Sequence, residues 1–337
     1  MHSSKIHPRE ALFEAEDLLP ALPVCDHYCG VEARMRKSLA LQAELGPVFD
    51  VTLDCEDGAP IGGEAEHALL VAELLLSPLN QHDRVGARVH PVSHPSFEQD
   101  LDTLIGRAGG RLAYLMVPKP QGIDDVRLAC DMVDHLTHVH GQSRPIPVHC
   151  LVETHGALRQ VQLIAAHPRI ESISFGLMDF VSAHRGAIPA MGMSVAGQFS
   201  HPLVVRAKLE ISAACHAFGK TPSHSVVTEF ANRSAIAEAA GRASGEFGFT
   251  RMWSIHPNQI RPIIEAFAPS AAETDHAIEV INAAQAAEWA PTSLRDTLHD
   301  RASYRYYWQV LERAHRTGQP LPAEVSLAFF SVPSSRP

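Results

Sequence analysis

The stretch IPVHCLVETHGALRQVQLIAAHPRIESISFGLMD, residues 146–179, decides the expected fold. It opens with an apolar run of strand length at 146–152, continues with a stretch of helical periodicity at 155–166, and returns to a strand-like run at 171–175. Apolar strands that alternate with a helix are typical of a parallel sheet, because its strands are buried on both faces. The segment therefore predicts one βαβ unit.

The same alternation extends in both directions, from about residue 20 to about residue 267. Strands are expected at 21–25, 48–54, 84–90, 111–117, 146–152, 171–175, 223–227 and 250–255. Helices are expected at 32–45, 64–76, 122–136, 155–166, 201–218, 231–243 and 258–266. This pattern predicts an α/β fold, a (β/α)8 TIM barrel, because closing the sheet pairs both of its edges. A doubly wound open sheet is the alternative, but no glycine-rich phosphate loop follows any strand.

The pattern changes after Pro269, where two helices without strands are expected at 271–288 and 302–316. We therefore expect a barrel domain over residues 1–268 and a C-terminal helical extension over 269–337. The second helix carries apolar residues that need a surface to cover. We expect them to pack on a neighbouring subunit, with packing on the chain's own barrel as the alternative. These residues are Tyr306, Trp308, Val310 and Leu311.

The composition disfavours several classes of protein. A formal net charge of -10 disfavours a nucleic-acid partner, and the basic run at 34–37 is expected to be a solvated helix face. No apolar run approaches the roughly 20 residues of a membrane span, and the first residues do not resemble a signal peptide. We expect a soluble cytoplasmic protein with no membrane partner.

Cysteine and histidine patterns give no metal motif. The six cysteines are sparse for a chain of 337 residues, and we expect no disulfide. Cys25, His27 and Cys29 lie close together, but no second half of a structural zinc site follows. The densest histidine group, at 135–140, has no carboxylate pattern nearby and is expected to be exposed.

Polar residues at the carboxyl ends of the expected strands are the candidate functional groups, because barrel enzymes place their active sites there. They are Asp54, Glu56, Asp57, Arg88, Lys119, Glu153, Asp179 and His256. Glu153 and Asp179 end consecutive strands, so their carboxylates can converge on Mg2+. The alternative is that both are helix N-caps, because acidic residues favour the first turns of helices. Arg88 needs an anionic partner. This partner can be one of the carboxylates of Glu56 and Asp57 or a substrate oxygen, and Arg88 can contact a carboxylate and the substrate at once.

Taken together, six motifs resemble the citrate lyase beta-subunit and malyl-CoA lyase family, in order and spacing along nearly the whole barrel. They are TLDCEDGAP (52–60), ARVH (87–90), MVPKP (116–120), LVETHGAL (151–158), SFGLMDF (174–180) and WSIHPNQI (253–260). The resemblance implies that Glu153 and Asp179 bind Mg2+ and that Arg88 contacts the carbonyl or enolate oxygen of the substrate. It also implies that Glu56 and Asp57 shape the pocket.

Members of this family cleave a 3-hydroxyacyl thioester into a 2-keto acid and acetyl-CoA or its acyl relative, with no cofactor beyond the metal. The resemblance thus implies a lyase for a malyl-, citramalyl- or citryl-thioester, with CoA as the carrier, in a homo-oligomer such as a trimer or hexamer. The segment LHDRASYRYYWQVLERA (298–314) resembles the family segment that protonates the enolate carbon in an adjacent subunit. It points to Asp300 as the acid, and the alternative is that Asp300 is only a helix N-cap.

Departures from the family pattern leave the acyl carrier open. Glu64 and His67 stand where the family usually has lysine and arginine, and His90 replaces an asparagine. One alternative is a class II pyruvate aldolase acting on free hydroxy-keto acids, which resembles this chain but has a histidine where Asp57 stands. Another is a barrel that binds a thioester without catalysis, against which the intact Glu153, Asp179 and Arg88 argue.

Overall fold

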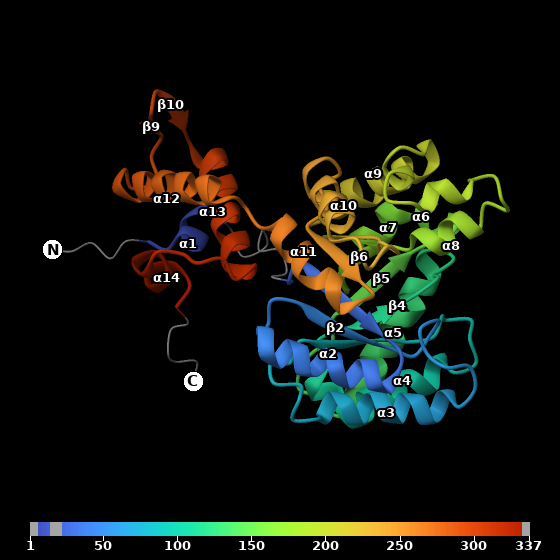
Figure 1. The fold of residues 1–337 in the computed structure, drawn as a ribbon. Coiled ribbons are helices and arrows are strands. Elements are labelled where there is room, and N and C mark those ends of the chain that lie inside the picture. Colours follow the sequence, from blue (N-terminus) through green and yellow to red (C-terminus); the bar gives the residue numbers. More distant parts are fainter. Residues whose placement is uncertain (1–5, 14–21, 332–337) are drawn as a thin grey trace. The chain divides into compact units, whose positions relative to one another are not determined.

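The computed structural model describes residues 6–13 and 22–331. Eight parallel strands form a closed barrel in sequence order, and pairing of β1 with β8 closes it (Figure 1). The strands are β1 (Cys25–Cys29), β2 (Asp50–Asp54), β3 (Val85–Arg88), β4 (Leu115–Val117), β5 (Val148–Val152), β6 (Ile170–Phe175), β7 (Thr221–His224) and β8 (Arg251–Ser254). The expected (β/α)8 barrel is confirmed.

Helices surround the barrel strands on the outside (Figure 1). They are α2 (Glu32–Leu45), α3 (Glu64–Leu76), α4 (Phe97–Ala108), α5 (Ile123–Val139), α6 (His155–Arg159), α7 (Val161–Ala166), α8 (Leu177–Ser182), α9 (Pro202–Ala217), α10 (Arg233–Gly245) and α11 (Pro257–Phe267). The bounds of α2 and α3 agree with the prediction. The sequence did not predict α4, which buries Phe97, Leu101 and Leu104 on one face.

The first strand begins four residues later than the start of the expected run at 21–25, whose first residue lies outside the described part. Its sequence, CDHYC, does not read as an apolar strand because Asp26 and His27 are polar. Both are nevertheless buried, and Asp26 forms an ion pair inside the barrel. A charge that is paired in the interior hides a buried strand from a search for apolar runs.

The chain divides into two compact units, and the described residues 22–266 form the barrel unit. Residues 6–13 and 267–331 form the helical unit. The helical unit contains α1 (Pro8–Leu12), α12 (Ala271–Ala286), α13 (Arg301–Arg316), α14 (Ala323–Phe329) and the antiparallel pair β9 (Thr292–Leu294) and β10 (Thr297–His299). The expectation of helices without strands after Pro269 is wrong, because Arg295 and Asp296 adopt φ of 51° and 61° and connect a two-residue hairpin.

The core of the helical unit includes a residue from the beginning of the chain. Leu12 of α1 is fully buried and lies in one apolar cluster with residues of α12 and α13. Arg305 Nε of α13 donates a hydrogen bond to the Leu12 carbonyl oxygen at 2.8 Å. The sequence had assigned residues 1–268 to the barrel and did not foresee that α1 packs with the C-terminal helices.

The apolar residues of α13 belong mostly to this core. Trp308 and Leu311 are fully buried and Val310 is 3% exposed, all within their own unit. The expectation that these three pack on a neighbouring subunit is therefore wrong, since α12 and α1 already cover them. Only Tyr306 of that group is exposed, at 55%.

All six cysteines lie in the described part, and each is buried with a free thiol. None of the described helices combines the length and apolar character needed to cross a membrane. In the histidine group at 135–140, the His140 ring contacts the Asp102 carboxylate at 2.8 Å.

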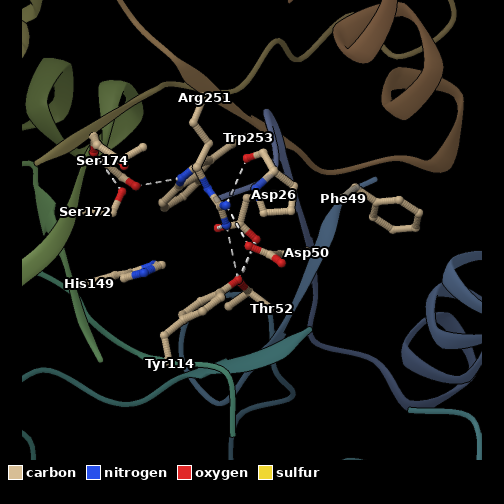
Figure 2. Close-up of polar contacts among 12 residues, drawn as sticks. Asp26, Phe49, Asp50, Thr52, Tyr114, His149, Ser172, Ser174, Arg251 and Trp253 are labelled. Carbon is tan, nitrogen blue, oxygen red and sulfur yellow. Dashed lines mark hydrogen bonds and ion pairs between the residues drawn. The ribbon is translucent and has the colours of Figure 1, made fainter. Parts of the chain in front are cut away.

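Charged and polar side chains fill the interior of the barrel around Arg251 (Figure 2). The guanidinium of Arg251 is fully buried and pairs with Asp50 at 2.6 Å and Asp26 at 3.1 Å. Thr52 donates a hydrogen bond to Asp26 at 2.7 Å, and so does the Tyr114 hydroxyl at 2.9 Å. Burial alone would lower the pKa of Arg251, but Asp50 and Asp26 raise it above its ordinary value. The interior thus holds a compensated ionic network.

We expect Tyr114→Phe to lower the free energy of unfolding by about 1–2 kcal/mol, because it removes a buried hydroxyl that bonds Asp26 and lies 2.6 Å from Thr52 Oγ1. Urea denaturation measures this change. Tyr306→Phe, at an exposed position, is the control and should leave stability unchanged. If Tyr114→Phe were as stable as the wild type, the hydroxyl would not contribute to the network.

Candidate active site

A cavity of about 770 Å³ opens where the barrel strands end at their carboxyl termini. Residues that follow or end different strands line it, among them Asp57, Arg88, Glu153 and Asp179. Asp54 and His256 line it as well, so the structure brings six of the eight candidate residues to one cavity. Glu56 lies directly behind them, because it contacts Arg88 at 3.1 Å.

Arg88 is fixed by a carboxylate that the sequence had not assigned to it. The register of β2 and β3 pairs Asp54 with Arg88. Arg88 Nε donates to Asp54 Oδ1 at 2.7 Å and Nη2 donates to Oδ2 at 2.5 Å. Burial alone would raise the pKa of Asp54, but Arg88 and backbone N–H donors hold it below its ordinary value. The expected pairing with Glu56 is also present, whereas Asp57 pairs with Lys119.

Lys119 connects three acidic residues at this end of the barrel. Its Nζ lies 2.5 Å from Glu56 Oε1, 2.6 Å from Asp57 Oδ2 and 3.9 Å from Asp179 Oδ1. Burial alone would lower the pKa of Lys119, but its hydrogen bonds to Asp57 and Glu56 raise it above its ordinary value. The ammonium therefore stays charged and offsets part of the negative charge at this end of the barrel.

Glu153 is a buried carboxylate, only 3% exposed. The backbone N–H of Lys119 donates to its Oε1 at 3.0 Å, and among the described residues no lysine or arginine forms an ion pair with it. Burial, and then the negative charge of Asp179, raise its pKa well above the ordinary value. A Cβ at Gly176 would lie 2.2 Å from Glu153 Oε2, so only glycine leaves room for this carboxylate.

The sequence suggested that Asp179 ends a strand. The structure instead places it in the first turn of α8. Its side chain is 46% exposed. The N-cap alternative does not hold for Glu153, because Thr154 is the N-cap of α6 and accepts a hydrogen bond from the Ala157 N–H. Asp179 occupies a helix first turn and borders the cavity at the same time.

The pair of Glu153 and Asp179 fits a small, hard cation. Magnesium prefers oxygen ligands and needs few of them from the protein, because water and substrate oxygens complete its octahedron. A divalent cation would also compensate the buried charge of Glu153. Within residues 6–13 and 22–331, no group of three or more histidine, cysteine or acidic residues has the geometry of a metal site.

Part of the cavity lining is apolar, and the sequence did not indicate it. Tyr28 stacks on Trp253 with ring centroids 4.0 Å apart. Trp253 Nε1 donates a hydrogen bond to Ser174 Oγ at 2.8 Å, which fixes the indole (Figure 2). Leu151, Phe175 and Val226 complete this apolar lining. Tyr28 escaped notice because it lies in the polar-looking strand β1.

A second cavity of about 620 Å³ adjoins the first, since Lys37, Phe230, Pro257 and Asn258 border both. Arg233 and Arg261 line the second cavity and Arg34 lines the first, against a single acidic residue, Glu44, in the second. Arg233 also pairs with Glu265 at 2.6 Å. The basic run at 34–37 is exposed, as expected, yet it borders a groove that favours anions.

His256 borders the first cavity, where its ring stacks on Phe230 at 4.7 Å. The two histidines at positions that depart from the family pattern have internal partners. The His67 ring contacts the Asp54 carbonyl oxygen at 2.9 Å, and His90 contacts Asp100 at 2.7 Å. These two contacts leave both histidines in structural roles beside the site.

Asp300 lies in the helical unit as the N-cap of α13. Its Oδ1 accepts hydrogen bonds from the backbone N–H groups of Ala302 at 3.0 Å and Ser303 at 3.3 Å. Ser303 Oγ in turn contacts the Asp300 N–H at 3.0 Å. The residue is exposed and its other carboxylate oxygen accepts neither of these bonds.

Residues 39–257 match the model of the HpcH/HpaI aldolase/citrate lyase family. This chain belongs to that family. An L-malyl-CoA/beta-methylmalyl-CoA lyase of Cereibacter sphaeroides is 26% identical over 254 residues, covering 71% of this chain and 77% of the relative. The mitochondrial citramalyl-CoA lyase of Mus musculus is 26% identical over 75% of this chain and 72% of its own.

Two solved structures are similar to this chain. A citrate lyase from Burkholderia xenovorans is 53% identical, with a TM-score of 0.84, over 96% of this chain and 100% of that one. The CitE protein of Mycobacterium tuberculosis, solved with magnesium, acetoacetate and coenzyme A, is 22% identical over 88% of this chain and 99% of its own, with a TM-score of 0.66. The latter likeness shows the shared fold.

Proposed function

We propose that this protein is a Mg2+-dependent carbon–carbon lyase. It cleaves or forms a malyl-, citramalyl- or citryl-type 3-hydroxyacyl thioester, with a 2-keto acid and an acetyl or acyl thioester as the other products. The observation that carries the proposal is Glu153, a buried carboxylate without an ion-pair partner among the described residues, which shares one cavity with Asp179 and Arg88. Membership of the aldolase/citrate lyase family supports the reaction class.

Glu153 and Asp179 would hold the Mg2+. When bound, the ion supplies a Lewis acid for the oxygens of the keto-acid half. The protein's own contribution is to position the ligands. The backbone N–H of Lys119 orients Glu153, and the Lys119 ammonium keeps Asp57 and Glu56 turned toward itself.

Arg88 would stabilise the enolate oxygen of the thioester. Asp54 holds the guanidinium in a bidentate pair and Glu56 contacts its third nitrogen, but these contacts do not occupy all of its N–H donors. Arg88 borders the cavity and is 8% exposed, and a preorganised donor that is largely shielded from water is effective against a developing negative charge. Because Asp54 and Glu56 fix Arg88 beforehand, the reaction does not have to reorganise it.

The acyl carrier would bind along the region shared by the two cavities, which Lys37, Phe230, Pro257 and Asn258 border. CoA carries phosphates, and Arg34, Lys37 and Arg261 offer cations beside this region. The relatives from Cereibacter sphaeroides and Mus musculus are named as lyases of CoA thioesters. We therefore propose CoA rather than a free acid as the form in which the acyl half binds.

The contacts of Asp57 weigh against the class II aldolase alternative. In that alternative a histidine at this position acts as a base, whereas Asp57 here is bound by the Lys119 ammonium at 2.6 Å. The cluster of Arg88, Glu153 and Asp179 in one cavity weighs against a barrel that only binds a thioester.

The proposed function is tested with malyl-CoA, citramalyl-CoA and citryl-CoA, each incubated with and without Mg2+. We expect release of a 2-keto acid from at least one of them, abolished by EDTA and restored by added Mg2+. Keto-acid release that persists in EDTA at the same rate, or the absence of release from all three thioesters, would contradict the proposal.

We further propose that Asp300 donates the proton to the enolate carbon in a neighbouring subunit of a homo-oligomer such as a trimer or hexamer. The helical unit would then be a domain that packs across the subunit interface. Asp300 is exposed and is the N-cap of α13. Its Oδ1 accepts the capping hydrogen bonds, so its other carboxylate oxygen would serve the reaction.

Mixing two inactive variants tests this arrangement. Asp300→Ala protomers and Glu153→Gln protomers should together regain part of the wild-type activity after subunit exchange, because one interface then combines an intact Asp300 with an intact metal site. Mixed activity is measured against each variant alone. No recovery after demonstrated exchange would show that Asp300 does not act across an interface.

A further inference from the structure

The second cavity lies between two helices on the outside of the barrel. Its lining residues include Lys37, Leu41 and Glu44 of α2 and Asn258 and Arg261 of α11. Helix α11 follows β8, and β8 pairs with β1 in parallel. Because the helices of such a barrel form a ring outside its strands in chain order, the space between α11 and α2 lies over β1. We call this space the α2–α11 groove.

Strand β1 directs His27 toward the α2–α11 groove. The neighbours of His27 point into the barrel, since Asp26 pairs with Arg251 there and Tyr28 stacks on Trp253. Successive side chains of a strand point to opposite faces, so His27 points outward. His27 is 2% exposed and lines the first cavity. The first cavity therefore extends from the barrel mouth to the floor of the groove.

Hydrogen bonds fix which nitrogen of His27 carries the hydrogen. The Ser254 hydroxyl donates its hydrogen to the His256 carbonyl oxygen at 3.0 Å. Ser254 Oγ can then only accept from His27 Nδ1, which lies 2.9 Å away. Burial lowers the pKa of His27 to about 4, so the ring is neutral near pH 7. Nδ1 therefore carries the hydrogen, and Nε2 carries a lone pair that can only accept.

The Nε2 atom of His27 has no partner among the described residues. None of them forms a hydrogen bond with it, and it is not one of their enclosed polar atoms without a partner, so it reaches the cavity that His27 lines. Ser38 lines the same cavity, but its hydroxyl donates to the Arg34 carbonyl oxygen at 2.8 Å. A donor from a bound molecule would satisfy this acceptor, which is costly to leave unpaired in a buried ring.

The order of groups along the cavities matches the order of groups in a CoA thioester. Arg88 and Glu153 border the first cavity at the barrel mouth, His27 lies at the floor of the groove, and Lys37 and Arg261 line the second cavity. In a CoA thioester the pantetheine amides lie between the sulfur and the phosphates. With the thioester near Arg88 and the phosphates near Arg261, an amide N–H is the group that passes His27.

We propose that His27 is a specificity-determining residue for the acyl carrier, because its Nε2 accepts a hydrogen bond from a pantetheine amide N–H in the α2–α11 groove. This inference rests on the proposed lyase function and adds a binding residue to it. A carrier arm with an ester oxygen in place of that N–H would leave the lone pair of His27 unpaired. The protein therefore discriminates against such an arm, as sites built around a hydrogen bond do.

Replacing His27 by Leu removes the acceptor and should weaken acetyl-CoA binding by about tenfold, which calorimetric titration measures. In the cleavage reaction the KM for the CoA thioester should rise by a similar factor while kcat stays within about twofold, because the contact is equal in the ground state and the transition state. Mg2+ affinity should remain at the wild-type value, since His27 is not one of the proposed ligands. His135→Leu, at an exposed position of α5, is the matched control and should change none of these quantities.

Analogues of the carrier test the hydrogen bond at the level of atoms. In these analogues of acetyl-CoA, an ester oxygen replaces the N–H of one pantetheine amide, each amide in turn. Wild-type protein should bind one of the analogues about tenfold more weakly than acetyl-CoA, whereas His27→Leu should bind that analogue and acetyl-CoA equally. This double-mutant cycle separates a direct contact from a structural effect of the substitution. The wild-type comparison is valid even if His27→Leu does not fold.

The outcomes separate this inference from the function on which it rests. Wild-type protein that binds acetyl-CoA and every ester analogue equally would overturn the inference and leave the lyase function intact. A loss with one analogue that persists in His27→Leu would also overturn it, because another residue would then accept that N–H. Wild-type protein that binds no acetyl-CoA would overturn both the inference and the proposed carrier. A loss in the wild type that disappears in His27→Leu supports the inference.

Discussion

Replacing Glu153 by Gln, or Asp179 by Asn, is expected to weaken Mg2+ binding by at least about 100-fold, because loss of a direct ligand should cost no less than loss of a residue that only orients one. Turnover should fall by at least about 1,000-fold, which corresponds to roughly 4 kcal/mol of transition-state stabilisation. Calorimetric Mg2+ titration and steady-state kinetics measure the two effects separately.

The fold of these variants should remain intact. Burial raises the pKa of Glu153, so its charged form is disfavoured, and neutral glutamine at this position should leave the thermal unfolding temperature equal to or above that of the wild type. Asp124→Asn is the matched control, since it removes the same charge from a side chain that is 91% exposed. Wild-type Mg2+ affinity in the double variant of Glu153 and Asp179 would show that the metal binds elsewhere.

Arg88→Lys should lower kcat by about 100- to 1,000-fold, or about 3–4 kcal/mol, which is the range for loss of an oxyanion-hole donor. A lysine keeps the charge but cannot reproduce the bidentate pair with Asp54 and at the same time aim further N–H groups at the substrate. The Mg2+ affinity should change much less, because Arg88 is not a ligand. Parallel kinetic and calorimetric measurements distinguish the two quantities.

The surface pair of Arg242, which is 31% exposed, and Glu246 provides a control for the same substitution. Arg242→Lys alters an ion pair on the surface of α10 and should leave kcat at the wild-type value. An unchanged kcat in Arg88→Lys would mean that Arg88 serves only as a structural partner of Asp54 and Glu56. A large loss of stability in that variant without a change in kcat would lead to the same conclusion.

The barrel was predictable because its strands, buried on both faces, alternate with helices of regular length. The exceptions share a physical cause, which is that the stabilising contact lies far away in the sequence. The segment CDHYC becomes a strand because Arg251, from the last strand, pairs with Asp26. Helix α1 is short, and its buried Leu12 has partners near the other end of the chain. Local periodicity carries no information about either contact.

The candidate site was predictable as a set of strand-end residues, but its internal pairing was not. Arg88 was expected to contact Glu56 or Asp57, whereas Asp54 holds it most closely. The signal was available, because Asp54 and Arg88 are the last residues of adjacent strands in register. The apolar lining left no such signal. Its residues look like ordinary core residues until a cavity is found beside them.

The position of α1 has a consequence for the order in which the molecule forms during synthesis. The barrel unit can close once about 266 residues have left the ribosome, whereas the core of the helical unit needs α13 as well. Until then the apolar cluster around Leu12 contains residues of α12 but lacks those of α13. The core around Leu12 is therefore completed only after α13 has been synthesised. Removing α1 or α13 would weaken the same small core. A substitution near residue 12 would destabilise α13, the helix that Asp300 caps.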